Sequence, residues 1–112
     1  RAYKISLEIH QATLSFPKSE QYGMADQMRR ASKSVCANFA EGFGKQSLSK
    51  IEFRKYLFIS LGSANEMIVW SDYSKDLGYI SSEQWKIWRN EYEQIAKMLQ
   101  GLYKSLKTIK NN

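Results

Sequence analysis

Five polar side chains repeat at helical spacing between residues 27 and 42, and their types could bind a ligand or support catalysis. They are Gln27, Arg30, Ser34, Asn38 and Glu41. Separations of three or four residues place them on one face of a helix. Three roles fit this face. In the first, the face is solvated and held by weak i,i+4 pairs. In the second, it forms a polar network partly buried between helices or subunits. In the third, it binds a ligand or supports catalysis.

The network interpretation predicts partners from a later part of the chain. Arg30 could pair with Glu41 or with Glu66, and Asn38 could bond across an interface. A buried unpaired charge costs several kcal/mol, so such groups must be satisfied. Glu41 and Glu66 could also act as an acid and a base, as in a nuclease, but carboxylates paired with Arg30 stay ionised and structural. The predicted polar network comprises Gln27, Arg30, Ser34, Asn38, Glu41, Ser63 and Glu66.

Other chemistry finds little support in the chain. His10 is the only histidine, so it cannot supply the Glu-x-x-His pairs of a di-iron bundle. Cys36 is the only cysteine and lies beside an apolar stripe without a nearby histidine, which favours a packed thiol and a reducing cytoplasm. The segment Gly42–Lys45 lacks the spacing of a phosphate-binding loop. We therefore predict no metal, no cofactor and no enzymatic activity.

Clustered cations give the clearest indication of a partner. The formal charge is +6 and the isoelectric point about 9.5, which favours polyanions such as RNA or DNA. A solvated basic face and an acidic protein partner are the alternatives. The predicted nucleic-acid contacts are Arg29, Arg30, Lys33, Lys45, Lys50, Arg54 and Lys55.

Two apolar stripes predict the first helices, which must position these side chains. The first helix stops at Pro17, which lacks a backbone donor. The second ends in the Gly42–Gly44 segment, whose glycines favour a left-handed cap. Their inward residues are predicted to be Ile5, Ile9, Ala12 and Phe16, then Met24, Met28, Ala31, Val35 and Phe39.

A third helix is predicted to begin at Ser47 or Ser49 and to stop at Gly78. Gly62 in its middle suggests that another backbone passes close to that turn. Its inward residues would be Phe53, Leu57, Leu61 or Ser60, Ala64, Ile68 and Ser71.

A fourth helix has a capping box at Ser81 and Gln84 and an unbroken apolar seam. The final residues 110–112 are expected to fray. The seam comprises Trp85, Trp88, Tyr92, Ile95, Leu99, Leu102, Leu106 and Ile109.

The fold class follows from these four stripes. One proline, few glycines and no strand pattern favour an all-α protein, and short connections favour an antiparallel up-down-up-down four-helix bundle. The 112 residues form one domain, residues 1–112. No apolar run is long enough to cross a membrane, which predicts a soluble cytoplasmic protein.

With Gly62, Ser63 and Glu66, the stretch from Gln27 to Gly42 resembles the bacterial 23S rRNA intervening-sequence proteins, which are small four-helix bundles of unknown function. Cys36 stands where that family usually has proline, and Trp70 where leucine is common. The similarity runs from Ile5 to Leu106. It is densest at Gln27, Arg29, Arg30, Ala31, Ser34, Ala37, Asn38, Ala40, Glu41, Gly42, Gly62, Ser63 and Glu66.

The resemblance implies a homopentamer and a relation to the accessory proteins of diversity-generating retroelements, which assist a reverse transcriptase and contact RNA. Five copies at +6 would carry 5 × 6 = +30. We therefore expect a non-enzymatic, basic, oligomeric bundle that acts as an RNA- or DNA-binding accessory protein. The alternative is a scaffold that captures a reverse transcriptase or another enzyme and has little nucleic-acid affinity of its own.

Overall fold

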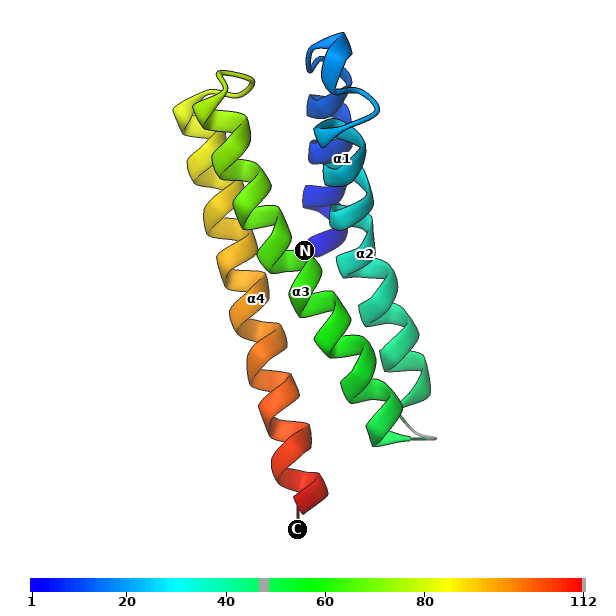
Figure 1. The fold of residues 1–112 in the computed structure, drawn as a ribbon. Helices are drawn as coiled ribbons and strands as arrows, with labels where there is room; N and C mark the ends of the chain where they lie inside the picture. The colour runs from blue at the N-terminus through cyan, green and yellow to red at the C-terminus, as the bar shows by residue number, and fades with distance from the viewer. Residues whose placement is uncertain (47–48, 112) are drawn as a thin grey trace.

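The computed structural model describes residues 1–46 and 49–111, with side chains up to Leu106. Its four helices are α1 (Ala2–Leu14), α2 (Met24–Lys45), α3 (Lys50–Asp76) and α4 (Ser82–Asn111), with a short 3-10 turn, η1 (Lys18–Glu20), between the first two. Successive helices are antiparallel, so the chain runs up, down, up and down (Figure 1). The predicted all-α four-helix bundle is confirmed.

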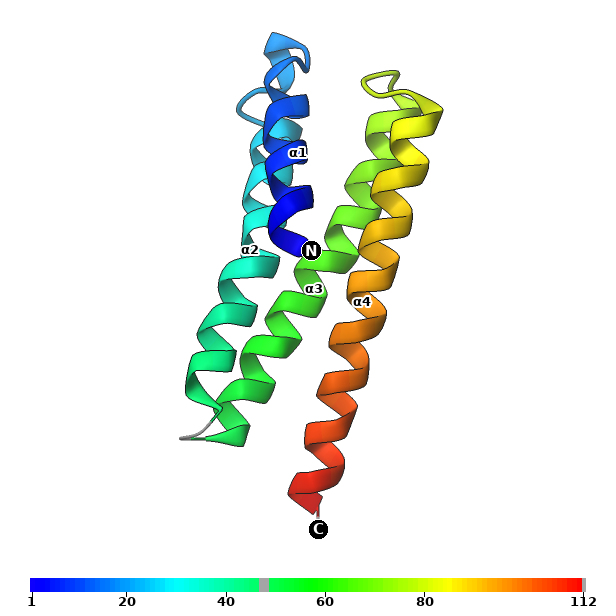
Figure 2. The same ribbon diagram turned by 180° about the vertical axis from the view of Figure 1, so that it is seen from behind.

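The helices differ in length, and this divides the bundle into two halves. The molecule is about 50 Å long and 22 × 19 Å across. In both views α1 lies beside only the upper half of α2, so the lower half consists of α2, α3 and α4 alone (Figures 1 and 2). A groove of about 410 Å³ lies below the start of α1. It is lined by Arg1, Ala2, Tyr3, Val35, Cys36, Phe39, Ile95, Met98, Leu99 and Leu102.

The core follows the predicted stripes with local differences. Phe39 is 37% exposed because α1 begins too high to cover it, so its predicted burial was wrong. On α3, Ser60 and Met67 are buried where Leu61 and Ile68 are only partly so. On α4, Trp85 and Leu102 are partly buried, and the side chain of Ile109 lies outside those described. The buried apolar residues are Ile5, Ile9, Phe16, Met24, Ala25, Met28, Ala31, Val35, Phe53, Leu57, Ala64, Met67, Trp88, Tyr92, Ile95, Leu99 and Leu106.

The ends of α3 and α4 match their predicted signals. The Ser49 hydroxyl accepts a hydrogen bond from the Glu52 amide at 3.1 Å, while Ser47 lies outside the described residues. After α3, Gly78 adopts φ +78°, and the Tyr79 amide donates to the Ser74 carbonyl at 2.8 Å. A glycine can adopt this left-handed conformation without the steric cost of a Cβ atom. The Ser81 hydroxyl caps α4 by accepting from the Gln84 amide.

Neither Gly42 nor Gly62 has the role predicted for it. Gly42 lies inside α2, which continues to Lys45 without a left-handed cap. A Cβ atom on Gly42 would lie 2.8 Å from the Tyr56 Cβ and 3.1 Å from the Phe53 ring, so this glycine permits α2 and α3 to approach closely. Gly62 has no neighbour within 4 Å of its Cβ position. The close backbone approach predicted at Gly62 is therefore absent within the described chain.

Candidate nucleic-acid interface

Of the predicted contacts Arg29, Arg30 and Lys33 on the upper part of α2, only Arg29 holds two elements of the fold together. The Arg29 guanidinium donates to the Thr13 hydroxyl at 3.0 Å and to the Gln21 carbonyl at 3.1 Å, so it ties α2 to the end of α1 and its connection. Arg30 pairs with Asp26, one turn earlier on α2, at 2.9 Å. Lys33 is exposed and lines a shallow groove between α1 and α2. Arg29 is thus already committed to neutral partners, and Arg30 to a carboxylate.

The predicted cations near the connection between α2 and α3 make different contacts. Lys45 lies 3.5 Å from Glu41 and also stands over the Tyr56 ring. Lys50 and Lys55 are exposed and pair with no acidic group among the described side chains. The Arg54 guanidinium carbon lies 4.3 Å from the centre of the Tyr103 ring, a cation–π contact with α4. We call Lys50, Arg54 and Lys55 the lower basic cluster.

The predicted polar network forms only in part. The Ser34 and Ser63 hydroxyls share a hydrogen bond of 2.8 Å between α2 and α3. The Asn38 amide donates to the Ser34 carbonyl and hydroxyl on its own helix, at 3.0 and 2.9 Å, rather than across an interface. Gln27 is exposed. The network therefore reduces to one short bridge between two helices.

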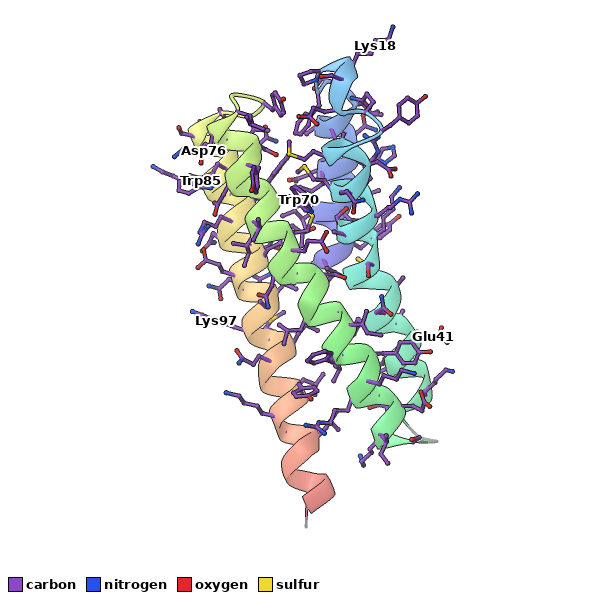
Figure 3. All side chains as sticks on the ribbon, in the orientation of Figure 1. Lys18, Glu41, Trp70, Asp76, Trp85 and Lys97 are labelled. Atoms are coloured by element: carbon purple, nitrogen blue, oxygen red, sulfur yellow. The ribbon has the colours of Figure 1, made fainter. Side chains whose placement is uncertain are left out.

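The charged members of the predicted network do not meet. Arg30 selects Asp26 rather than Glu41 or Glu66, because residues four apart on a helix are nearest neighbours. Glu41 pairs with Lys45 low on α2, whereas Glu66 accepts from the Trp70 indole at 3.0 Å in the upper half (Figure 3). The two carboxylates are at different heights in the bundle and do not form an acid–base pair.

The single cysteine and histidine are placed as packed groups. Burial raises the pKa of the Cys36 thiol, although a hydrogen bond with Ser6 opposes the shift. A thiol with a raised pKa is a poor nucleophile at neutral pH. His10 is half-buried. Among the described residues, no three His, Cys, Asp or Glu side chains are grouped so that they could hold a metal ion.

A charged cluster that the sequence did not reveal joins α3 to α4 in the upper half. Asp72 accepts from the Trp85 indole and from Arg89, both at 2.7 Å. Desolvation raises the pKa of Asp72. The hydrogen bonds from Trp85 and Arg89 and the charge of Arg89 lower this pKa by more, so the net shift is downward. The hydrogen bond to Asp72 raises the pKa of Arg89. This cluster is structural.

The family model for the 23S rRNA-intervening sequence protein matches residues 1–101. The chain belongs to this family. A crystal structure of a protein of unknown function from the S23 ribosomal protein family of Bacteroides thetaiotaomicron is similar, with a TM-score of 0.80 and 26% sequence identity. The similarity covers 92% of this chain and 91% of that one. No curated protein matches the sequence.

In this member of the 23S rRNA-intervening sequence family, Cys36 and Trp70 depart from the usual pattern without interrupting their helices. α2 is continuous through Cys36, where the family usually has proline. Trp70 is partly buried and bonds Glu66. No described helix is both long enough and apolar enough to span a bilayer.

Sequence reasoning missed the aromatic residues beside the lower basic cluster. Phe58 follows Arg54 by four residues, so their common face on α3 could have been found from spacing. Their contact with Tyr103 could not, because it depends on how α3 and α4 align. The Phe58 and Tyr103 ring centres lie 5.9 Å apart.

Proposed function

We propose that this chain is a non-enzymatic accessory protein that binds RNA or DNA as a homo-oligomer in the cytoplasm. The observation that carries the proposal is the lower basic cluster, where Lys50, Arg54 and Lys55 lie within two turns of α3 without a carboxylate partner among the described side chains. Phosphate binding requires cations that are not already neutralised. These three residues meet that condition better than Arg29 and Arg30 do.

The outward face of α3 supports self-association. Gly62, Val69 and Tyr73 lie seven and four residues apart and are all exposed, and we call them the outer α3 stripe. A helix with apolar residues on both its inner and outer faces is normally covered on both. The open space above Gly62 would accept the backbone of a second copy. A homopentamer, as the family resemblance implies, would place five lower basic clusters on one particle.

A scaffold that captures a reverse transcriptase or another enzyme is the second candidate. The apolar groove between α2 and α4 favours it, because Phe39 and Met98 are exposed there and could pack against a partner. This function predicts a stable complex with the partner enzyme and little affinity for bare nucleic acid.

Fluorescence anisotropy tests the main proposal. Labelled RNA and duplex DNA are titrated at several salt concentrations with protein whose mass is fixed by light scattering. The test variant replaces Lys50, Arg54 and Lys55 with Glu. The control replaces the exposed Lys4, Lys18 and Lys86, and each triple variant changes the charge by 3 × −2 = −6, from +6 to 0.

We expect submicromolar binding at low salt, strongly weakened in the test variant and retained in the control. Each phosphate contact contributes about 0.7 to 0.9 to the salt slope, so removal of three contacts lowers the slope by about 2 to 3. Equal loss in both variants would show that net charge alone governs binding. No binding by a well-formed oligomer at low salt would favour the scaffold.

A further inference from the structure

A groove with an unusual lining opens beside the lower basic cluster, between α3 and α4. Its volume is about 480 Å³. It combines two cations, two aromatic rings and two aliphatic side chains, and none of the described side chains that line it is acidic. The lining residues are Ile51, Arg54, Lys55, Phe58, Ile59 and Tyr103.

An exposed aromatic ring forms one wall of this groove. Phe58 lies within α3 rather than at its end, and its side chain is 63% exposed. Its ring packs obliquely on Tyr103, with an interplanar angle of 42°. Much of the Phe58 ring is therefore free to stack on a flat ligand.

The groove's arginine is held by a ring rather than by a carboxylate. Arg54 stacks on Tyr103, and its Nε is buried without a hydrogen-bond partner among the described residues. The cation–π contact holds the guanidinium group beside the ring without neutralising its charge. Lys55 adds a second, exposed cation at the rim.

This pairing of rings and cations selects a chemical class of ligand. Cations alone would serve any polyanion, whereas an exposed ring between two cations adds a face on which a flat, negatively charged ligand can stack. Nucleotides combine a flat base with a phosphate. In a duplex the base faces are covered by neighbouring base pairs, whereas in a single strand they are accessible.

We propose that the Arg54–Phe58–Tyr103 groove binds single-stranded nucleic acid, with an unpaired base stacked on Phe58 and the adjoining phosphates on Arg54 and Lys55. The proposal rests on the function proposed above and narrows it from nucleic acid in general to unpaired strands. Duplex DNA and an acidic peptide, which offer charge without accessible base faces, are the competing ligands.

Two ligands and two variants separate stacking from charge. The ligands are a labelled oligothymidylate and an abasic deoxyribose-phosphate strand of equal length, with duplex DNA and polyglutamate for comparison. The variant Phe58→Ala removes the ring and places a good helix former on an exposed position. Tyr22→Ala is the control, because Tyr22 is 98% exposed and lies outside the groove.

Wild-type protein should bind the thymidylate strand more tightly than the abasic strand. Phe58→Ala should weaken binding to the thymidylate strand about 5- to 150-fold, the range given by alanine substitution of a stacking aromatic residue. Its binding to the abasic strand and to duplex should not change. Tyr22→Ala should match the wild type with every ligand.

Three outcomes overturn the inference. Equal affinity for the thymidylate and abasic strands, unchanged by Phe58→Ala, would leave general nucleic-acid binding intact but remove stacking at this groove. Polyglutamate binding as tight as that of the thymidylate strand would make the groove an acidic-peptide site. No binding of any nucleic acid at low salt would overturn the proposed function as well.

Discussion

The upper and lower halves of the bundle treat their charged groups differently. In the upper half, Arg29 is bonded to the end of α1 and Arg89 is paired with Asp72. In the lower half, where α1 is absent, Lys50 and Lys55 have no acidic partner among the described side chains. In the upper half, Arg29 and Arg89 join one helix to another, whereas Lys50 and Lys55 in the lower half are exposed and available to a ligand.

The same contrast holds for apolar side chains. The upper core is closed by α1, whereas below α1 the groove between α2 and α4 leaves Phe39 and Met98 exposed. Packing of four helices thus stabilises the upper half, and the absence of α1 leaves accessible apolar surface in the lower half.

The largest effect is expected from the core of the upper half. Trp88 is fully buried, so Trp88→Ala should lower the free energy of unfolding by about 3 to 5 kcal/mol. Leu99 borders the lower groove, so Leu99→Ala should cost only about 2 kcal/mol. Chemical denaturation measures both. Equal costs would show that the two halves are equally well packed.

Alanine substitutions at Gly42 and Gly62 should change the free energy of unfolding in opposite directions. Gly42→Ala should destabilise the fold by about 1 to 3 kcal/mol, because its Cβ would collide with Tyr56 and Phe53. Gly62→Ala should raise the stability of the isolated chain by about 0.5 to 1 kcal/mol, since the site is open and Ala favours helix.

Thermal denaturation measures the glycine effects, and Gly101→Ala is the control because Gly101 also has open space around it. If the outer α3 stripe joins copies of the chain, Gly62→Ala should weaken assembly in light scattering while Gly101→Ala should not. Unchanged assembly in both variants would contradict self-association through this stripe.

A smaller effect is expected at the buried phenol on α4. Burial raises the pKa of Tyr92, whose hydroxyl has no hydrogen-bond partner among the described residues. Tyr92→Phe should therefore leave stability unchanged or raise it by up to about 1 kcal/mol, because it removes an unsatisfied polar atom and keeps the ring. Loss of stability in denaturant titrations would mean that the hydroxyl is satisfied after all.

The smallest effect concerns the ion pair of the upper half. The pKa of Asp72 is lowered in the folded state, so its contribution is present above the unfolded value of about 3.9 and is lost as the pH falls through the folded value. Asp72 is partly exposed, so the loss in Asp72→Asn at pH 7 should be only a few tenths of a kcal/mol. The difference between variant and wild type should shrink below about pH 4 in urea titrations.

The sequence predicted the fold from helical spacing and end signals. Ile5, Met28, Leu57 and Trp88 lie in the core as expected, because apolar periodicity reports directly on burial. The predicted burial of Phe39 was wrong, because spacing along one helix does not reveal how far a neighbouring helix extends. Gly42 and Gly62 look alike in sequence, and only the packing of α2 on α3 separates them.

The candidate site was only partly accessible to sequence reasoning. Lys50, Arg54 and Lys55 were found as a cluster, but charge counting gave Arg29 and Arg30 equal weight. Composition reveals neither the hydrogen bonds of Arg29 to Thr13 and Gln21 nor the pairing of Arg30 with Asp26. The stacking of Arg54 on Tyr103 depends on a contact between distant segments. Short-range patterns therefore located the cations, and tertiary structure decided which are available.

The close contact at Gly42 also bears on the order in which the chain folds. It lies next to the short connection between α2 and α3, so these two helices can pair through contacts that are near in sequence and entropically inexpensive to form. We expect this hairpin to appear early in the transition state. α4 and the shorter α1 would then dock on it, which makes a single glycine important for the kinetics of folding as well as for its endpoint.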